Sequence, residues 1–122
     1  MPSRARTPSP GSPVRGSRTG RPMMAAMDLL GRRWTLRVIW ELQQQPRRFR
    51  ELKRSCDDMS SSVLSRRLGE LIEAGIVETG EDGVYRLTPL GERLEAALSP
   101  LLGWSQEWER SGALALQRGQ DG

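Results

Sequence analysis

The chain has 122 residues, 36% of them hydrophobic, and a formal net charge of +4, which allows one small domain with tails. It contains one cysteine and no histidine, which excludes an intrachain disulfide, a histidine-based catalytic triad and a zinc site with imidazole ligands. It has no glycine-rich phosphate loop, and its serines and carboxylates show no catalytic or metal-binding spacing. We therefore expect neither an enzyme nor a protein with a metal or another cofactor.

Residues 1–22 are rich in Pro, Ser, Gly and Arg and contain almost nothing that could be buried. Such a segment cannot offset the entropy lost on ordering, so we expect a disordered basic tail. The tail lacks the apolar stretch of a secretory signal, and no part of the chain is long and apolar enough to span a membrane. These features indicate a cytoplasmic protein.

Two helices are expected after the tail. The first covers residues 23–30 and ends at Gly31. The second covers residues 34–43 and ends before Pro46. Because this second helix is apolar nearly all round, we expect it to be buried on several sides and to form the centre of the domain.

Residues 46–75 are expected to form two short helices joined by a polar turn at residues 57–60, which is typical of a helix-turn-helix. The apolar residues of the first helix recur at helical spacing: Phe49, Leu52 and Cys56. Cys56 is therefore interpreted as a core residue, with a redox switch as the alternative. The second helix, residues 61–74, has one apolar stripe that we expect to face inward: Leu64, Leu68, Leu71 and Ile72.

Gly75 is expected to end this helix in a left-handed conformation. Two short β-prone stretches, 76–79 and 84–88, then flank an Asp-Gly turn, which is a strong signal for a β-hairpin. A hairpin directly after a recognition helix is a wing.

Thr88 and Pro89 are expected to open a last helix, as its N-cap and first-turn residue. Its apolar stripe continues as far as Trp108, and Pro100 must kink or divide it. We expect the folded domain to cover residues 23–112 and the end of the chain, 113–122, to be frayed.

Positive charge is concentrated in the first half of the chain. Residues 1–22 carry +5 and residues 32–67 carry +6, whereas residues 68–122 carry −6. A polyanionic partner explains a basic tail and a basic helix-turn-helix better than a general need for solubility. The alternative is that these arginines only form a solvated surface.

Four segments in this order resemble the HxlR-type winged helix-turn-helix regulators of bacteria, within the MarR-like superfamily. They are DLLGRRWT (28–35), PRRFRELKR (46–54), SSSVLSRRLGELIEAGIVE (60–78) and YRLTPLGERL (85–94). The resemblance implies an α+β, mostly α fold, namely a winged helix-turn-helix with a short β-hairpin wing and with N- and C-terminal dimerisation helices. It also implies a homodimeric transcriptional regulator whose partner is double-stranded DNA with an inverted repeat.

Two features depart from the pattern of this family. Members often carry a redox-sensing cysteine before a proline at the start of the first helix, where this chain has Arg21-Pro22. The wing is also shorter than usual and acidic near its tip, at Glu78, Glu81 and Asp82. We therefore expect the tip to contact phosphates poorly and Arg86, at the base of the wing, to contribute more.

The N-terminal part of the helix over residues 61–74 is expected to enter the major groove. The candidates for base contacts are Ser61, Ser62, Ser65 and Arg66. Arg66 is the best of them, because a guanidinium can pair with two acceptors of guanine. The candidates for phosphate contacts are Arg32, Arg33, Arg47, Arg48, Arg50, Lys53, Arg54, Arg67 and Arg86. The candidates for the dimer interface are Met23, Met24, Met27, Leu98, Leu101, Trp104 and Trp108.

The sequence thus predicts a sequence-specific DNA-binding transcriptional regulator that acts as a homodimer on a pseudo-palindromic operator. One alternative is a winged helix that binds another protein, for which the acidic wing leaves room. A second alternative is a DNA-binding regulator with a small-molecule effector pocket at the Trp-rich dimer interface, although the spacing of the tryptophans favours simple packing. The basic tail could add non-specific attraction to DNA or a minor-groove arm.

Overall fold

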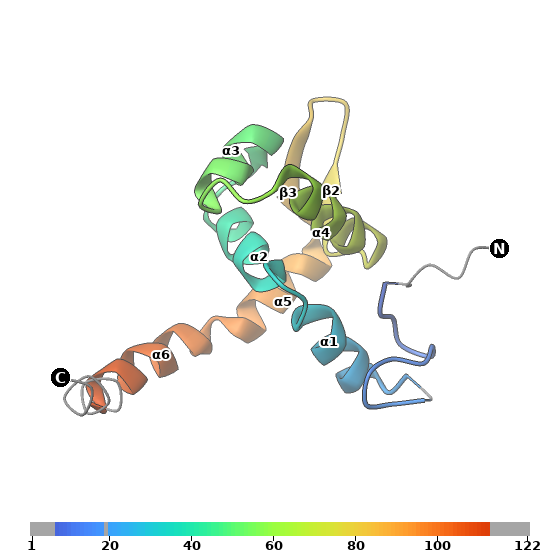
Figure 1. Cartoon of the computed structure of the whole chain (residues 1–122), viewed down its shortest axis with the longest axis vertical. Coiled ribbons are helices and arrows are strands. Elements are labelled where there is room, and N and C mark those ends of the chain that lie inside the picture. Colours follow the sequence, from blue (N-terminus) through green and yellow to red (C-terminus); the bar gives the residue numbers. More distant parts are fainter. Residues whose placement is uncertain (1–6, 19, 113–122) are drawn as a thin grey trace.

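The computed structural model describes residues 7–18 and 20–112, and in this part of the chain six helices accompany three short strands (Figure 1). In chain order they are α1 Pro22–Leu30, α2 Thr35–Gln44, β1 Arg47–Arg48, α3 Phe49–Ser55, α4 Ser61–Glu73, β2 Val77–Thr79, β3 Val84–Leu87, α5 Pro89–Leu98 and α6 Pro100–Arg110. This arrangement confirms the expected class, an α+β, mostly α winged helix-turn-helix. No helix in the described ranges has the length and apolar character needed to cross a bilayer.

The second helix, α2, forms the centre of the domain, as expected, and contacts α1, α3, α4, α5 and β3. Its inner face is fully buried at Val38, Ile39 and Leu42. Leu36 and Trp40, in contrast, are 40% and 42% exposed. The prediction of burial on several sides is therefore wrong for the face that bears these two residues, which is turned toward the C-terminal helices.

The helix-turn-helix consists of α3, a turn and α4. Asp57 and Asp58 in the turn have φ values of 58° and 55°, a left-handed conformation that aspartate tolerates better than most residues. The Ser60 hydroxyl accepts a hydrogen bond of 3.4 Å from the Val63 amide and so caps the N-terminus of α4. Three residues of the predicted stripe are buried: Leu64, Leu68 and Leu71.

Ile72 does not join that stripe and is 40% exposed, so the prediction that it faces inward is wrong. At 100° per residue it lies about 80° around the helix from Leu64, at the edge of the face that packs on the core. Gly75 then ends the helix with a φ of 81°, and the Ile76 amide donates to the Leu71 carbonyl at 2.9 Å. This C-terminal cap confirms the expected left-handed glycine.

The sheet is antiparallel, with β3 between β1 and β2. Strands β2 and β3 form the predicted hairpin, in which Val77 pairs with Leu87. Strand β1 was not predicted, because Arg47 and Arg48 were expected at the start of a helix. They pair instead with Tyr85 and Val84 of β3, an interaction that a two-residue segment cannot signal by periodicity.

The C-terminal helical region is divided at Pro100 into α5 and α6, as predicted. Thr88 caps α5 by accepting a hydrogen bond of 3.0 Å from the Gly91 amide. Gly91 is buried against the Ile76 carbonyl, where a Cβ atom would clash, so the start of α5 packs closely on the residue that precedes β2. Helix α6 extends away from the body and buries none of its own residues (Figure 1).

The described part of the N-terminal segment lies beside α1, and the expected disorder of the basic tail stays a prediction. The Gly11 amide donates to the Gly20 carbonyl at 2.9 Å, and the Arg15 amide donates to Asp28 at 3.3 Å. Pro8 is buried. The expected frayed end, residues 113–122, lies outside the described residues, and the division of the chain at residues 22 and 112 remains a prediction.

We predict that Leu68→Ala lowers the free energy of unfolding by about 2–4 kcal/mol, because it removes a side chain that is only 2% exposed. Ile72→Ala, in the same helix, should cost less than about 1.5 kcal/mol because that side chain is already partly in water. Urea denaturation followed by far-ultraviolet circular dichroism, at one protein concentration, compares the two variants. Equal losses would contradict the orientation of α4 described above.

Candidate nucleic-acid interface

The four residues expected to contact bases, Ser61, Ser62, Ser65 and Arg66, are all exposed on α4. At 100° per residue, Ser62 and Arg66 lie opposite the buried leucines, whereas Ser61 and Ser65 lie toward the flank of the helix. The Ser62 hydroxyl lies 2.9 Å from the hydroxyl of Ser60, the capping residue. Arg66 forms no hydrogen bond or ion pair with any described residue, so its guanidinium is free to bind a ligand.

A basic depression of about 470 Å³ lies between α3 and the N-terminus of α4. Arg50, Lys53 and Arg54 line it from α3, Asp58 from the turn and Ser61 from the first turn of α4, so that three cations face one carboxylate. None of the three cations pairs with another described residue. The partial positive charge of a helix N-terminus adds to theirs, so the depression attracts an anion such as a DNA phosphate. The structure thus brings together three of the predicted phosphate contacts.

The wing has its acidic tip partly neutralised by two arginines. The Arg86 guanidinium donates to Asp82 Oδ2 at 2.9 Å, and Arg48 Nη1 donates to the Asp82 carbonyl at 2.7 Å. The hydrogen bond from the Val84 amide, followed by that from Arg86, lowers the pKa of Asp82. Strand β1 places Arg48 beside the wing, and this strand was not predicted from the sequence.

A network of two arginines and one glutamate links α4 to the turn between α1 and α2. Glu70 accepts hydrogen bonds from Arg32 Nη1 at 2.7 Å and from Arg67 Nη1 at 2.8 Å. Arg67 Nε donates to the Arg33 carbonyl at 2.8 Å. The side chains of Arg32, Arg67 and Glu70 are only 24%, 13% and 12% exposed, so these arginines act inside the protein by orienting the recognition helix.

The predicted phosphate contacts therefore fall into two groups. In the first group, the side chains form no hydrogen bond or ion pair with any other described residue: Arg33, Arg50, Lys53 and Arg54. In the second group, the side chains bind other parts of the protein: Arg32, Arg47, Arg48, Arg67 and Arg86. The first group is better placed to bind DNA, because its cations do not have to give up a partner.

Arg37 has a structural role that sequence analysis missed. Its guanidinium donates to Glu41 at 2.9 Å and to the Ser55 carbonyl at 2.7 Å, which ties α2 to the C-terminal end of α3. The hydrogen bond to Glu41 is the main cause of the raised pKa of Arg37. In the sequence, only the four-residue separation between Arg37 and Glu41 indicated an ion pair on α2. That spacing did not indicate the contact with Ser55.

Cys56 is fully buried in the core, as predicted. Burial raises the pKa of its thiol, which favours the less reactive protonated form. A redox response would require the core to open around this residue.

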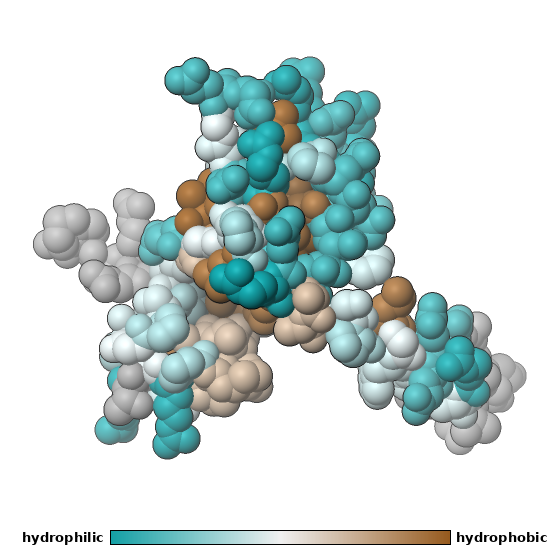
Figure 2. Space-filling view, turned by 180° about the vertical axis from the view of Figure 1, so that it is seen from behind, coloured by the Kyte–Doolittle hydropathy of each residue, from teal (hydrophilic) through white to brown (hydrophobic). Residues whose placement is uncertain are grey.

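Most of the residues expected at a dimer interface are apolar side chains that the single chain leaves exposed on α1 and α6, whereas Met24 and Leu98 are half-buried. Met23, Met27, Leu101, Trp104 and Trp108 are between 45% and 65% exposed. Hydrophobic residues are visible at the base of the body and at the start of α6 (Figure 2). Apolar area of this kind is typical of a surface that binds another protein.

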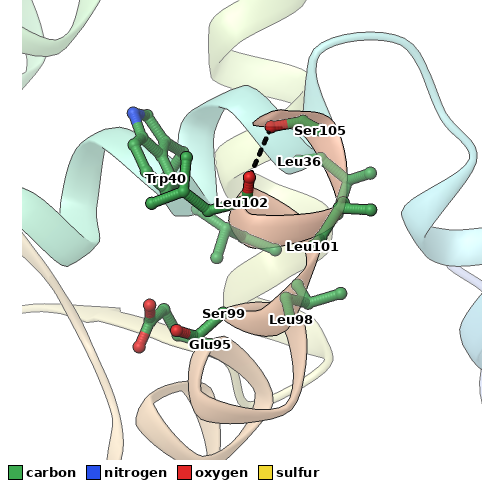
Figure 3. Close-up of a pocket in the computed structure, with 9 residues that line it drawn as sticks. Leu36, Trp40, Glu95, Leu98, Ser99, Leu101, Leu102 and Ser105 are labelled. Atoms are coloured by element: carbon green, nitrogen blue, oxygen red, sulfur yellow. Dashed lines mark hydrogen bonds between the residues drawn. The ribbon is translucent and has the colours of Figure 1, made fainter. Parts of the chain in front are cut away.

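An apolar pocket of about 240 Å³ lies between α2 and the C-terminal helices. Figure 3 shows Leu36 and Trp40 of α2 facing Leu98, Leu101 and Leu102, with the Ser105 hydroxyl donating to the Leu102 carbonyl. Of the chain's tryptophans, only Trp40 lines this pocket. Trp104 and Trp108 stack on each other along α6 with ring centroids 5.4 Å apart, which favours packing over a ligand cage.

We predict that Glu70→Gln lowers the free energy of unfolding by roughly 1–3 kcal/mol, because it weakens charge-assisted hydrogen bonds to two partly buried arginines. Glu109→Gln, at an exposed site on α6, is the control and should leave the stability unchanged. Thermal denaturation monitored by circular dichroism measures both. If the two variants unfold at the same temperature as the unmodified chain, the network does not hold α4 in place.

Comparison with known proteins assigns the chain to a family. Residues 29–112 match the HxlR-like helix-turn-helix family. YvaP, an uncharacterised HTH-type transcriptional regulator of Bacillus subtilis, is 34% identical over 89 residues, which are 68% of this chain and 82% of YvaP. The HTH-type transcriptional regulator YodB of the same bacterium is 32% identical over 96 residues, covering 74% and 86% of the two chains.

Solved structures agree with this assignment. Quinone-bound YodB superposes with a TM-score of 0.65 at 34% identity, over 70% of this chain and 96% of YodB. A possible HxlR family transcriptional factor from Thermoplasma volcanium superposes with a TM-score of 0.62 at 31% identity, over 70% and 82% of the two chains. The chain therefore belongs to the HxlR-like helix-turn-helix family of transcriptional regulators.

Proposed function

We propose that the protein is a sequence-specific DNA-binding regulator that acts as a homodimer on a pseudo-palindromic operator. The observation that carries this proposal is the N-terminal half of α4, which exposes Arg66 and three serines and whose Ser61 lies beside the unpaired cations of α3. In helix-turn-helix proteins this part of the second helix reaches the base edges of the major groove.

Arg66 is the residue assigned to base recognition. Its guanidinium has two parallel N–H donors that match the O6 and N7 acceptors of guanine, and no described side chain competes for them. The serines are more adaptable, since a hydroxyl can bind a base or a phosphate equally well. Specificity at the guanine contact should therefore depend on Arg66 more than on any serine.

Phosphate binding is assigned first to the depression between α3 and α4. Arg50, Lys53 and Arg54 converge there on the N-terminus of a helix, so one phosphate can meet several donors at once. Arg33, whose carbonyl accepts a hydrogen bond from Arg67 of α4, is a second contact point. Arg48 and Arg86 would contribute through the wing only if DNA competes with Asp82 for their donors.

Dimerisation is supported by the open apolar surface on α1 and α6. A monomer would leave Met23, Met27, Leu101, Trp104 and Trp108 in water, whereas a second copy would bury them. Two recognition helices related by a two-fold axis would then enter successive major grooves, with half-sites about 34 Å apart or a multiple of that distance.

Two other functions are less well supported. A winged helix that docks on a protein has no evident use for unpaired cations gathered around a helix N-terminus. Response to a small molecule is suggested by quinone-bound YodB. A response through a thiol adduct would be hindered here, because Arg21-Pro22 stands where a sensing cysteine is expected and the chain's one cysteine, Cys56, is buried.

We predict that fluorescence anisotropy will show preferential binding to DNA from the chain's own upstream region over scrambled DNA of equal length, at two salt concentrations. Arg66→Ala should reduce this preference by about 1–3 kcal/mol at the guanine contact. Arg54→Ala is a matched loss of one positive charge and should weaken binding to both DNAs alike. It should also reduce the slope of the logarithm of the binding constant against the logarithm of salt concentration by about the contribution of one phosphate contact.

Each outcome of this experiment is informative. Equal weakening of both DNAs by Arg66→Ala would remove that residue from base recognition. Equal, strongly salt-sensitive binding of the unmodified chain to both DNAs would show that affinity comes from counterion release alone, or that the operator lies elsewhere, which selection from random duplexes would resolve. Absence of binding in both assays would favour the protein-docking alternative.

We also predict that the chain sediments as a dimer at micromolar concentration and that Leu101→Glu shifts it to a monomer. The substitution places a charge on a side chain that is 52% exposed in the single chain and would be buried between two copies. Gln106→Glu adds the same charge to the same helix at an exposed polar position and should leave the dimer intact. Sedimentation velocity distinguishes these results, and a monomeric unmodified chain would contradict the two-half-site arrangement.

A further inference from the structure

A second apolar cavity, of about 400 Å³, shares no lining residue with the pocket of Figure 3. It is half-open, and it is bordered by α1, the C-terminal end of α4, the start of α5 and the N-terminal segment. Its volume falls within the range of roughly 300–1,000 Å³ that is usual for small-molecule sites.

Small side chains explain why this space is not filled by the core. Ala25 and Ala26 of α1 and Ala74 after α4 point into a region whose other walls are leucines of α1 and α5. A leucine in place of one of these alanines would occupy much of the volume. The walls of the cavity are therefore mostly apolar, and its interior is not filled by side chains. An apolar cavity of this kind favours an apolar ligand over ordered water.

The N-terminal segment borders one side of the cavity. Pro8 is buried, and both Pro8 and Pro10 line the cavity. Contacts within this segment and between it and α1 include those of Arg15 with Asp28 and the hydrogen bond of 3.0 Å from the Arg21 amide to the Ser17 hydroxyl.

Glu73 is the only charged residue among those that line the cavity. No arginine or lysine in the described part of the chain lies within ion-pair distance of it. Its carboxylate stands in the last turn of α4, where the partial negative charge of the helix C-terminus adds to its own. The cavity thus disfavours an anion and favours a positive charge attached to an apolar group.

The cavity adjoins the proposed dimer surface on α1. Ala25 and Leu29, on the inner side of α1, are 2% and 6% exposed, whereas Met23 and Met27 on its outer side are 65% and 54% exposed. Leu30, which also lines the cavity, follows these methionines at helical spacing and so lies between the two surfaces. A ligand in this cavity would contact the end of the helix whose other end faces DNA.

We propose that this cavity is an effector site for a small apolar monocation, such as an aryl- or alkyl-substituted ammonium compound, held by Glu73 and the alanine-lined walls. The proposal of a cation site does not depend on the function proposed above. Its role as an effector, in which occupancy alters the position of α4 and thereby the affinity for the operator, rests on the function proposed above.

The test is isothermal titration calorimetry of the full chain with benzyltrimethylammonium, and with benzenesulfonate as an anion of similar size. We expect saturable binding of the cation and none of the anion. Glu73→Gln should weaken cation binding by about tenfold, because it removes one charge–charge attraction that solvent partly screens. Glu109→Gln, the control, should not weaken it. Ala26→Leu should abolish binding by filling the cavity, and Ala96→Leu, at an exposed site on α5, should not.

Circular dichroism of each variant establishes that loss of binding is not loss of fold. No saturable binding of the cation, equal binding of the anion, or binding unaffected by both Glu73→Gln and Ala26→Leu would overturn the site. Operator affinity is then measured with and without the cation. An unchanged affinity would overturn the effector role alone, and a chain that binds no DNA would overturn the proposed function while calorimetry still decides on the site.

Discussion

The burial of one face of α4 against the rest of the domain is the constraint on which the proposed DNA surface depends. Leu64, Leu68 and Leu71 are almost completely removed from water, and the apolar area they bury is what keeps a short helix folded. Since side chains at this spacing share one face, the same burial directs Arg66 to the solvent. The packing of the α4 leucines thus contributes to the hydrophobic core and also decides which side of α4 faces the solvent.

Electrostatic contacts then refine what packing establishes. Glu70 binds both Arg32 and Arg67, which fixes the angle of α4 relative to the turn between α1 and α2. These two arginines use their charge within the protein, whereas the cations of α3 remain free. The arginines and lysines of a basic helix-turn-helix therefore include some that stabilise the fold and others that are available to bind DNA. The net charge of the segment does not distinguish between these two groups.

Helix α4 also connects two surfaces of different chemistry. Its N-terminal end, near Ser61, lies beside a basic depression suited to phosphate. Its C-terminal end, at Glu73, lines an apolar cavity with a negative charge. The helix dipole favours an anion at the first end and a cation at the second. Because both ends belong to one rigid element, a ligand that shifts either end changes the position of the other.

Local patterns in the sequence were enough to determine the helix-turn-helix, the hairpin, the caps at Thr88 and Gly75, the break at Pro100 and the burial of Cys56. Each of these depends on residues a few positions apart, whose preferences act within one turn of helix or one hairpin. The recognition of the family rests on the same segments, since their order and spacing are local properties as well.

Tertiary structure alone decided the pairing of Arg48 with β3, the contacts of Arg32 and Arg67 with Glu70, the exposure of Leu36 and Trp40, and the cavity beside the N-terminal segment. Arg32 and Glu70 are separated by 38 positions, and Arg48 and Asp82 by 34. Whether two such groups meet depends on how whole helices and strands pack, because an arginine has the same local preferences whether or not a distant carboxylate reaches it. The sequence thus determined which elements form, while packing decided which of their charges remain free to bind a partner.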